Sequence, residues 1–126
     1  MKKVLLDTNM MLAPVQFKAD IYSAITADFY TLDNCMKELK KIAEKKTKSG
    51  APSRTAVRAR AAFILAKVKA VKTIKAGKKE TDKALTEEAK KGEYIVATND
   101  RELIKALKKL DIRVLRLKQK KLVIEE

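Results

Sequence analysis

The sequence contains no His and no Trp, and only one Cys, two Pro and three Gly among its 126 residues. Without His, an imidazole base and a His-ligated metal site are both excluded. The single Cys excludes an internal disulfide framework and a cysteine-based zinc ribbon. The glycines, at positions 50, 77 and 92, are too scattered for a P-loop or a GxGxxG fingerprint. Any catalysis by this chain must therefore use carboxylates, hydroxyls, lysines or a metal bound through oxygen.

Long apolar runs are also missing. The longest stretch without a charged residue, 8–17, has ten residues, whereas a membrane-spanning helix needs about 20. The apolar run behind Lys2 and Lys3 ends at Asp7, too early for a secretory signal. With 46% hydrophobic and 37% charged residues, the chain can build a core and is too charged for a membrane protein. These features and the lone Cys35 predict one cytoplasmic domain over residues 1–126.

Positive charge is concentrated in the middle of the chain. Residues 34–79 carry a net charge of +13 out of +14 for the whole chain, and acids dominate or balance the two ends. Such a block is typical of a surface that binds a phosphate backbone. The alternative is a solvated lysine face of the kind found in thermophile proteins. Because the aromatics are only three Phe and three Tyr, binding by charge and shape is favoured over base stacking.

Strand and helix patterns alternate along the sequence. Short apolar runs predict strands at 3–6, 28–32, 71–74, 93–98, 112–117 and 122–124. Helical spacing predicts helices over 16–27, from 33 or 34 to about 45, and over 54–69, 81–91 and 100–109. In the helix at 54–69, Val57, Ala61, Ile64, Leu65 and Val68 share one face, which we expect to be buried. The alternation predicts an α/β fold, a three-layer α/β/α sandwich with a central parallel sheet.

Four carboxylates are expected at one edge of that sheet. Asp7 and Asp100 each follow a predicted buried strand, and Glu38 and Asp82 lie near the starts of helices. Carboxyl ends of parallel strands form the ligand-binding edge of such sheets. The simpler interpretation is that each acid caps a helix or complements its dipole. Four converging carboxylates would repel one another unless a cation offset them, and oxygen ligands without His favour Mg²⁺ or Mn²⁺.

These segments resemble the PIN-domain nuclease family. The resemblance rests on Asp7-Thr8-Asn9, Glu38-Leu39, Asp82-x-x-Leu85-x-x-x-Ala89 and Thr98-Asn99-Asp100-Arg101, and it extends over about residues 3–117. It implies an α/β/α sandwich and an Mg²⁺- or Mn²⁺-dependent endoribonuclease that hydrolyses RNA phosphodiester bonds. The implied metal-binding and catalytic residues are Asp7, Glu38, Asp82 and Asp100, with Thr98 and Asn9 as supporting side chains.

The end of the chain, 100–103, 112–117 and 121–124, looks like the small-subunit rRNA-processing PIN proteins. The implied partner is then rRNA or its precursor. The toxins of toxin–antitoxin pairs use the same four acids, and they would bring an antitoxin-like protein as partner. The basic middle third favours a large structured RNA over a toxin's single cut. A homodimer is a further alternative.

Two other classes of function compete with the nuclease interpretation. One is a non-catalytic RNA- or protein-binding scaffold of the same fold, against which the presence of all four acids argues. The other is a receiver- or phosphatase-like domain with Asp7 as phosphoacceptor, which would want a strand-end Lys or a second nearby Asp.

Basic residues flank the predicted loop at 46–53. We expect them to hold the RNA backbone: Lys45, Lys46, Lys48, Arg54 and Arg58. Arg54 and Arg58 lie one turn apart on one helix face, and the alternative for this pair is an ordinary solvated surface.

Overall fold

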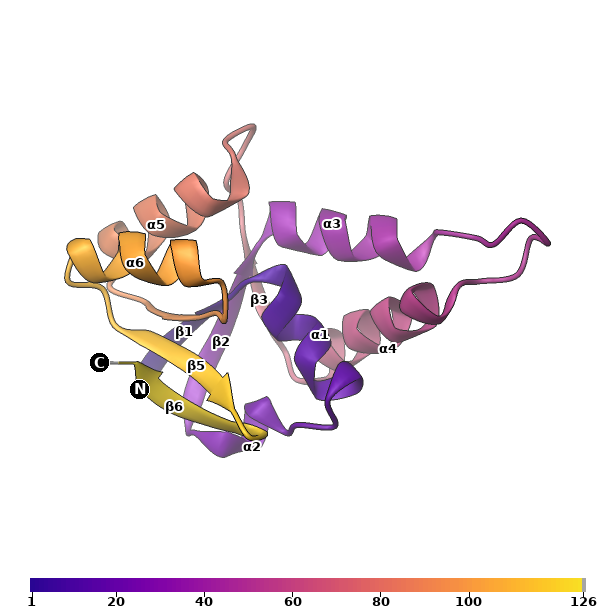
Figure 1. The fold of residues 1–126 in the computed structure, drawn as a ribbon. Coiled ribbons are helices and arrows are strands. Elements are labelled where there is room, and N and C mark those ends of the chain that lie inside the picture. The colour runs from indigo at the N-terminus through magenta and orange to yellow at the C-terminus, as the bar shows by residue number, and fades with distance from the viewer. Residues whose placement is uncertain (126) are drawn as a thin grey trace.

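The computed structural model describes residues 1–125 and shows a six-stranded sheet with helices on both faces (Figure 1). The strands are β1 (Lys2–Leu6), β2 (Ala27–Leu32), β3 (Lys72–Ile74), β4 (Ile95–Ala97), β5 (Val114–Lys118) and β6 (Lys121–Glu125). Their order is β3-β2-β1-β4-β5-β6, and all neighbours are parallel except β5 and β6. The predicted α/β class with a central, mostly parallel sheet is confirmed.

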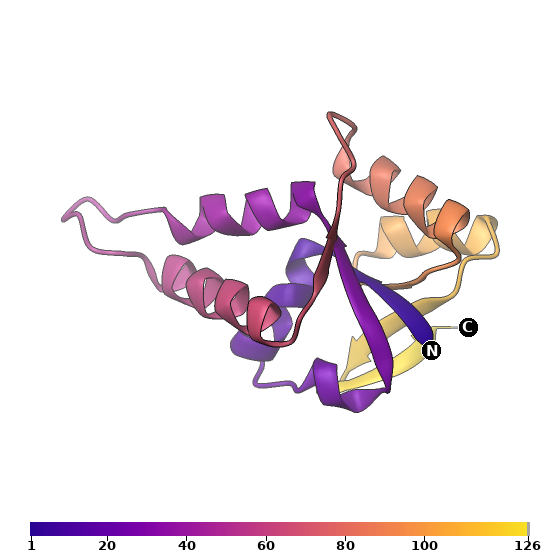
Figure 2. The same cartoon turned by 180° about the vertical axis from the view of Figure 1, so that it is seen from behind.

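The helices form two layers. They are α1 (Thr8–Gln16), α2 (Ile21–Ala24), α3 (Asp33–Ala43), α4 (Arg54–Val68), α5 (Thr81–Gly92) and α6 (Arg101–Lys109). Helices α1, α3 and α4 pack together on one side, and α5 and α6 lie on the other (Figures 1 and 2). The hairpin of α3 and α4 reaches well beyond the sheet. Within residues 1–125, every helix is too short or too polar to cross a membrane.

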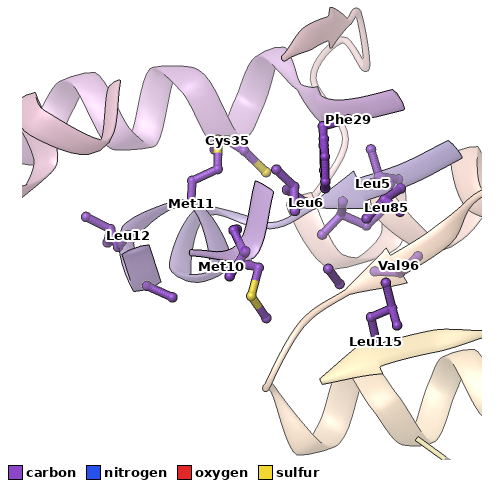
Figure 3. Packing of buried hydrophobic residues seen from close by; sticks show 14 of the residues in the cluster. Leu5, Leu6, Met10, Met11, Leu12, Phe29, Cys35, Leu85, Val96 and Leu115 are labelled. Atoms are coloured by element: carbon purple, nitrogen blue, oxygen red, sulfur yellow. The ribbon is translucent and has the colours of Figure 1, made fainter. Parts of the chain in front are cut away.

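The core lies around β1. Val4, Leu5 and Leu6 are fully buried, because β1 is central and helices cover both faces of the sheet. Met10 and Met11 of α1 fill the space against this strand, and Cys35 of α3 is buried in the same cluster (Figure 3). The first helix is therefore fixed tightly to the strand that precedes it.

The predicted helix over 16–27 is wrong. The structure has α1 over Thr8–Gln16, then a break, then the short α2. Asp7 caps α1 and Asp20 caps α2, so each begins at its own acid. Lys18 between them has a positive φ of 53°, which interrupts a right-handed helix. Phe17, at the C-terminal end of α1, is 50% exposed.

The predicted inner face of α4 is also wrong. Val57, Ile64 and Val68 are 54%, 62% and 72% exposed. The buried face consists of alanines: Ala56, Ala59, Ala62 and Ala66. Small side chains let α4 approach α1 and α3 closely, so tight backbone packing replaces the burial of large aliphatic groups.

This inversion gives a direct test of the fold. Replacing Ala62 by Leu should destabilise the protein by roughly 1–3 kcal/mol, because the closely packed face has no room for added methylenes. Replacing Ile64 by Ser should change stability by less than about 0.5 kcal/mol, since Ile64 is already in water. Urea denaturation of both variants measures the two effects. A strongly destabilised Ile64→Ser with a neutral Ala62→Leu would show that α4 is turned the other way.

Candidate active site

The pairing of β1 with β4 sets the geometry of the carboxyl edge. Leu6 and Ala97 are register partners, so the next residues, Asp7 and Thr98, lie side by side. Both are buried. The hydroxyl of Thr98 donates to Asp7 Oδ2, and the N–H of Met10 donates to Asp7 Oδ1 at 2.7 Å. Asp7 is thus both the N-cap of α1 and a buried carboxylate held from two sides.

Asp100 joins the same network through Thr98. Its N–H donates to Thr98 Oγ1 at 3.1 Å. Its own Oδ1 caps α6 by accepting from the N–H groups of Glu102 and Leu103 at 3.0 and 3.2 Å. The side chain is exposed. Asp100 therefore acts as an N-cap and also contributes negative charge to this edge. Helix capping and a place in an acidic site are thus compatible roles for the same residue.

Burial dominates the electrostatics of Asp7. It raises the pKa of this carboxyl to about 6 from 3.8, although the hydrogen bonds from Thr98 and the Met10 N–H favour the charged form. The negative charges of Asp100 and Asp82 act in the same direction as burial. Among the described residues 1–125, the charges that act on Asp7 are thus negative.

Asp82 belongs to the same acidic group. It lies in the first turn of α5 and is exposed. Its pKa is raised by partial burial, and further by the charges of Asp100 and Glu80. Three of the four acids expected at the edge, Asp7, Asp82 and Asp100, are therefore electrostatically coupled. We call these three residues the acidic edge.

The charge of the fourth acid, Glu38, is not among those that raise the pKa of Asp7 or Asp82. Glu38 is exposed on α3 and lines a separate hollow with Asn34, Lys37 and Lys41. The charges that act on Asp7 are those of Asp82 and Asp100. Asn9 on α1 is exposed and lines a hollow that it shares with Asp100, so it does lie beside the acidic edge.

The side chains of the acidic edge are of the type that binds a hard divalent cation. They offer carboxylate oxygens, and coupled like charges at Asp7, Asp82 and Asp100 favour a cation that offsets them. Within residues 1–125, no three Asp, Glu, Cys or His side chains are gathered closely enough to hold an ion as they stand. Asp82 and Asp100 are exposed, and exposed side chains change rotamer readily.

The basic residues lie on the hairpin of α3 and α4. Lys45, Lys46 and Lys48 are exposed in the connecting loop, Arg54 is exposed at the start of α4, and Arg58 is half-buried. Backbone hydrogen bonds between Thr47 and Ala51, at 2.7 Å, and between Gly50 and Thr47, at 3.0 Å, close the loop into a turn. The tip of the hairpin is thus an ordered, basic projection (Figure 1).

The supporting role of Asn99 at this edge was not predicted. The Asn99 amide donates to the Leu117 carbonyl at 3.1 Å and accepts from the Leu117 N–H at 2.8 Å, which ties the loop carrying Asp100 to β5. Glu80 adds its charge to Asp82. The only sequence signal for Asn99 was its place between Thr98 and Asp100. Its hydrogen-bond partners are backbone groups of Leu117, and the sequence pattern does not reveal contacts with backbone.

The protein is therefore a doubly wound α/β fold with electrostatically coupled acids at the carboxyl ends of its strands. The family model of the PIN-like domain matches residues 4–120, so the chain belongs to that family. A solved domain of a functionally unknown protein from Methanocaldococcus jannaschii DSM 2661 is similar, with a TM-score of 0.58 and 18% identity over 100% of this chain and 95% of that one. At this identity the likeness concerns the fold. No curated protein matches the chain in sequence.

The buried carboxylate predicts an unusual pH dependence of stability. The folded state keeps the Asp7 proton up to about pH 6, whereas the unfolded chain releases it near 3.8. Between these values the folded state binds more protons, so stability falls as the pH rises through this window. The full cost, at most roughly 3 kcal/mol, is present above pH 6.

Asp7→Asn should therefore raise the melting temperature at pH 8 in metal-free buffer, and the gain should shrink at pH 4.5. Asn also caps helices, so the start of α1 is retained. Thermal melts of the variant and the parent protein across this range measure the effect. A variant that is less stable at pH 8, or a difference that does not change with pH, would contradict the assignment.

Proposed function

We propose that this protein is a metal-dependent ribonuclease that hydrolyses RNA phosphodiester bonds at the carboxyl edge of its sheet. The observation that carries the proposal is the coupling of the buried Asp7 to Asp82 and Asp100. Uncompensated carboxylates cost stability, and an edge of this kind is suited to binding a divalent cation. Membership of the PIN-like family supports the same activity.

Asp7, Asp82 and Asp100 would hold the Mg²⁺ or Mn²⁺ ion, and Glu38 is a further ligand candidate by its motif. When bound, such an ion supplies water activation at neutral pH and stabilises charge that develops on the phosphate. Thr98 orients the Asp7 carboxylate from one side, and the Met10 N–H fixes it from the other. The Asp7 carboxylate, which would be a ligand of the ion, is thus preorganised by the β1–β4 pairing and by the start of α1.

The basic hairpin would hold the RNA backbone. Lys45, Lys46 and Lys48 project into solvent at its tip, and Arg54 follows on α4. Phosphate contacts of this kind give affinity without sequence information. The charge of the projection favours a large structured RNA, such as rRNA or its precursor, over the single cut of a toxin.

A non-catalytic RNA-binding scaffold is the second candidate. The observation that favours it is that, as the side chains of residues 1–125 stand, no three metal-binding groups are gathered, and Glu38 lies on a separate hollow. In that case the acids would serve as helix caps only. The two functions differ in their response to a single substitution at Asp100.

Asp100→Asn removes one negative charge while keeping a side chain that caps α6. If the edge binds a metal for catalysis, RNA cleavage in Mn²⁺ should fall by about 100-fold or more, the scale on which single stabilising groups act. The rise in melting temperature on adding Mn²⁺ should shrink as the affinity for the ion falls. RNA binding should persist, because a charge that repels phosphate has been removed.

Asp111→Asn is a matched control. Asp111 is exposed and has a positive φ of 57°, a conformation that Asn adopts well. This variant has the same net charge as Asp100→Asn and should keep full activity and the full Mn²⁺ response. Equal activity of both variants with unchanged Mn²⁺ shifts would reject the nuclease function and support the scaffold.

Salt dependence tests the role of the hairpin. Each neutralised phosphate contributes a slope of about −0.9 for duplex or −0.7 for single strands to log affinity against log salt concentration. Changing Lys45, Lys46 and Lys48 together to Gln should therefore weaken RNA binding and flatten the slope by about 2 to 3. Titrations of labelled RNA at several salt concentrations give both values.

The control is a triple Gln variant with the same net charge, made at exposed lysines of α5 and α6: Lys91, Lys105 and Lys109. It should retain most of the affinity and of the slope. If the two triple variants behave alike, the hairpin lysines are a solvated surface and have no special part in RNA binding.

A further inference from the structure

Two adjoining hollows form a groove next to the acidic edge. One, of about 450 Å³, contains Asn9 and Asp100. The other, of about 510 Å³, contains Lys18 and Lys120. Gln16, Phe17 and Asn99 line both, so the two hollows adjoin at these residues. We name the two adjoining hollows together the Phe17 groove. It runs from Asp100, along the end of α1, to the turn between β5 and β6.

An exposed aromatic ring lies in the middle of this groove. Phe17 is 50% exposed, whereas every other aromatic side chain in the described chain is buried or half-buried. Four of those others pair edge to face, Tyr22 with Phe29 and Tyr30 with Tyr94. Exposing the apolar ring of Phe17 to water costs free energy, and the packing of the core does not require it.

The walls of the groove contain strained backbone. Lys18, Gln119 and Lys120 have positive φ values of 53°, 50° and 65°, in a region that non-glycine residues enter only at a cost. Gln119 and Lys120 form the two-residue turn between β5 and β6, where Asn-Gly would be the relaxed choice. The sequence instead keeps long side chains, including two lysines, around Phe17.

The groove is fixed relative to the acids. The two hydrogen bonds between Asn99 and the Leu117 backbone join the loop that carries Asp100 to the strand that leads into the turn. A ligand bound against Phe17 would consequently have a defined position relative to Asp100. The chemistry of the groove is an aromatic face with amides of Asn9 and Gln16 on one side and cations at the far end.

We propose that the Phe17 groove binds one nucleotide of single-stranded RNA next to the bond that is cut, with its base stacked on Phe17. This inference rests on the proposed ribonuclease function and adds a subsite to it. Lys18 and Lys120 attract the phosphate on the side away from the acids, and the amides of Asn9 and Gln16 offer hydrogen bonds to base edges. Base–aromatic stacking with nearby cations is the recurrent mode of binding single strands.

The test uses the absence of Trp from the chain. Phe17→Trp places the protein's single tryptophan in the groove, where it can be excited selectively over tyrosine. Leu110→Trp is the matched control, because Leu110 is 40% exposed at the C-terminal end of α6 and lines a different hollow. Each variant is titrated in EDTA with a short oligouridylate and with an abasic ribose-phosphate chain of equal length. We expect the uridylate to quench the fluorescence of Phe17→Trp and the abasic chain to have little effect on it. The fluorescence of Leu110→Trp should respond to neither oligomer.

Cleavage of a single-stranded RNA in Mn²⁺ provides the second readout. Phe17→Ala should raise KM by roughly 5- to 150-fold, the loss that corresponds to one stacked base, with kcat little changed. Leu110→Ala should match the parent protein. If the parent cleaves RNA while Phe17→Trp responds equally to both oligomers and Phe17→Ala keeps its KM, the subsite is refuted and the nuclease stands.

If the parent protein fails to cleave while uridylate still quenches Phe17→Trp selectively, the base-binding groove is upheld and the proposed catalysis is refuted. Quenching by neither oligomer, with a new signal only on addition of a protein partner, would overturn the proposal and assign Phe17 to a protein contact.

Discussion

The contact on which the site depends is the one between Asp7 and Thr98. It follows from the parallel pairing of β1 and β4, in which Leu6 lies opposite Ala97. Both strands end at these residues. One residue further along, the buried Thr98 hydroxyl donates a hydrogen bond to the buried Asp7 carboxylate. The same hydroxyl accepts the Asp100 N–H, so one threonine relates two helix starts and two acids.

This arrangement has an electrostatic cost that the fold does not itself relieve. Burial and two neighbouring acids raise the pKa of Asp7, while the surplus of positive charge lies on residues 34–79, much of it on the hairpin of α3 and α4. The charges that act on Asp7 and Asp82 are those of other acids, so the basic block does not neutralise this edge. Such an arrangement suits a molecule that holds a cation at one place and a polyanion at another.

The six strands and the meeting of Asp7, Thr98 and Asp100 at the ends of two of them could be predicted, because buried parallel strands and the residues at their ends leave strong sequence patterns. Helix α1 was missed, since Thr8–Gln16 has no charged residue and contains Pro14, so it lacks the polar face that marks a helix. The face of α4 was inverted because alanines carry a weak hydrophobic signal, although they pack most closely. The exposure of Phe17 was not expected either, since it depends on where α1 ends.

The most direct test of the account is a crystal of the protein soaked in MnCl₂, with diffraction collected at a wavelength where manganese scatters anomalously. If the acids bind the ion, an anomalous peak should lie at the Asp7 carboxylate, with the side chains of Asp82 and Asp100 turned toward it. No peak at this edge, at a Mn²⁺ concentration that saturates any activity, would contradict the central claim that the acidic edge exists to bind a metal ion.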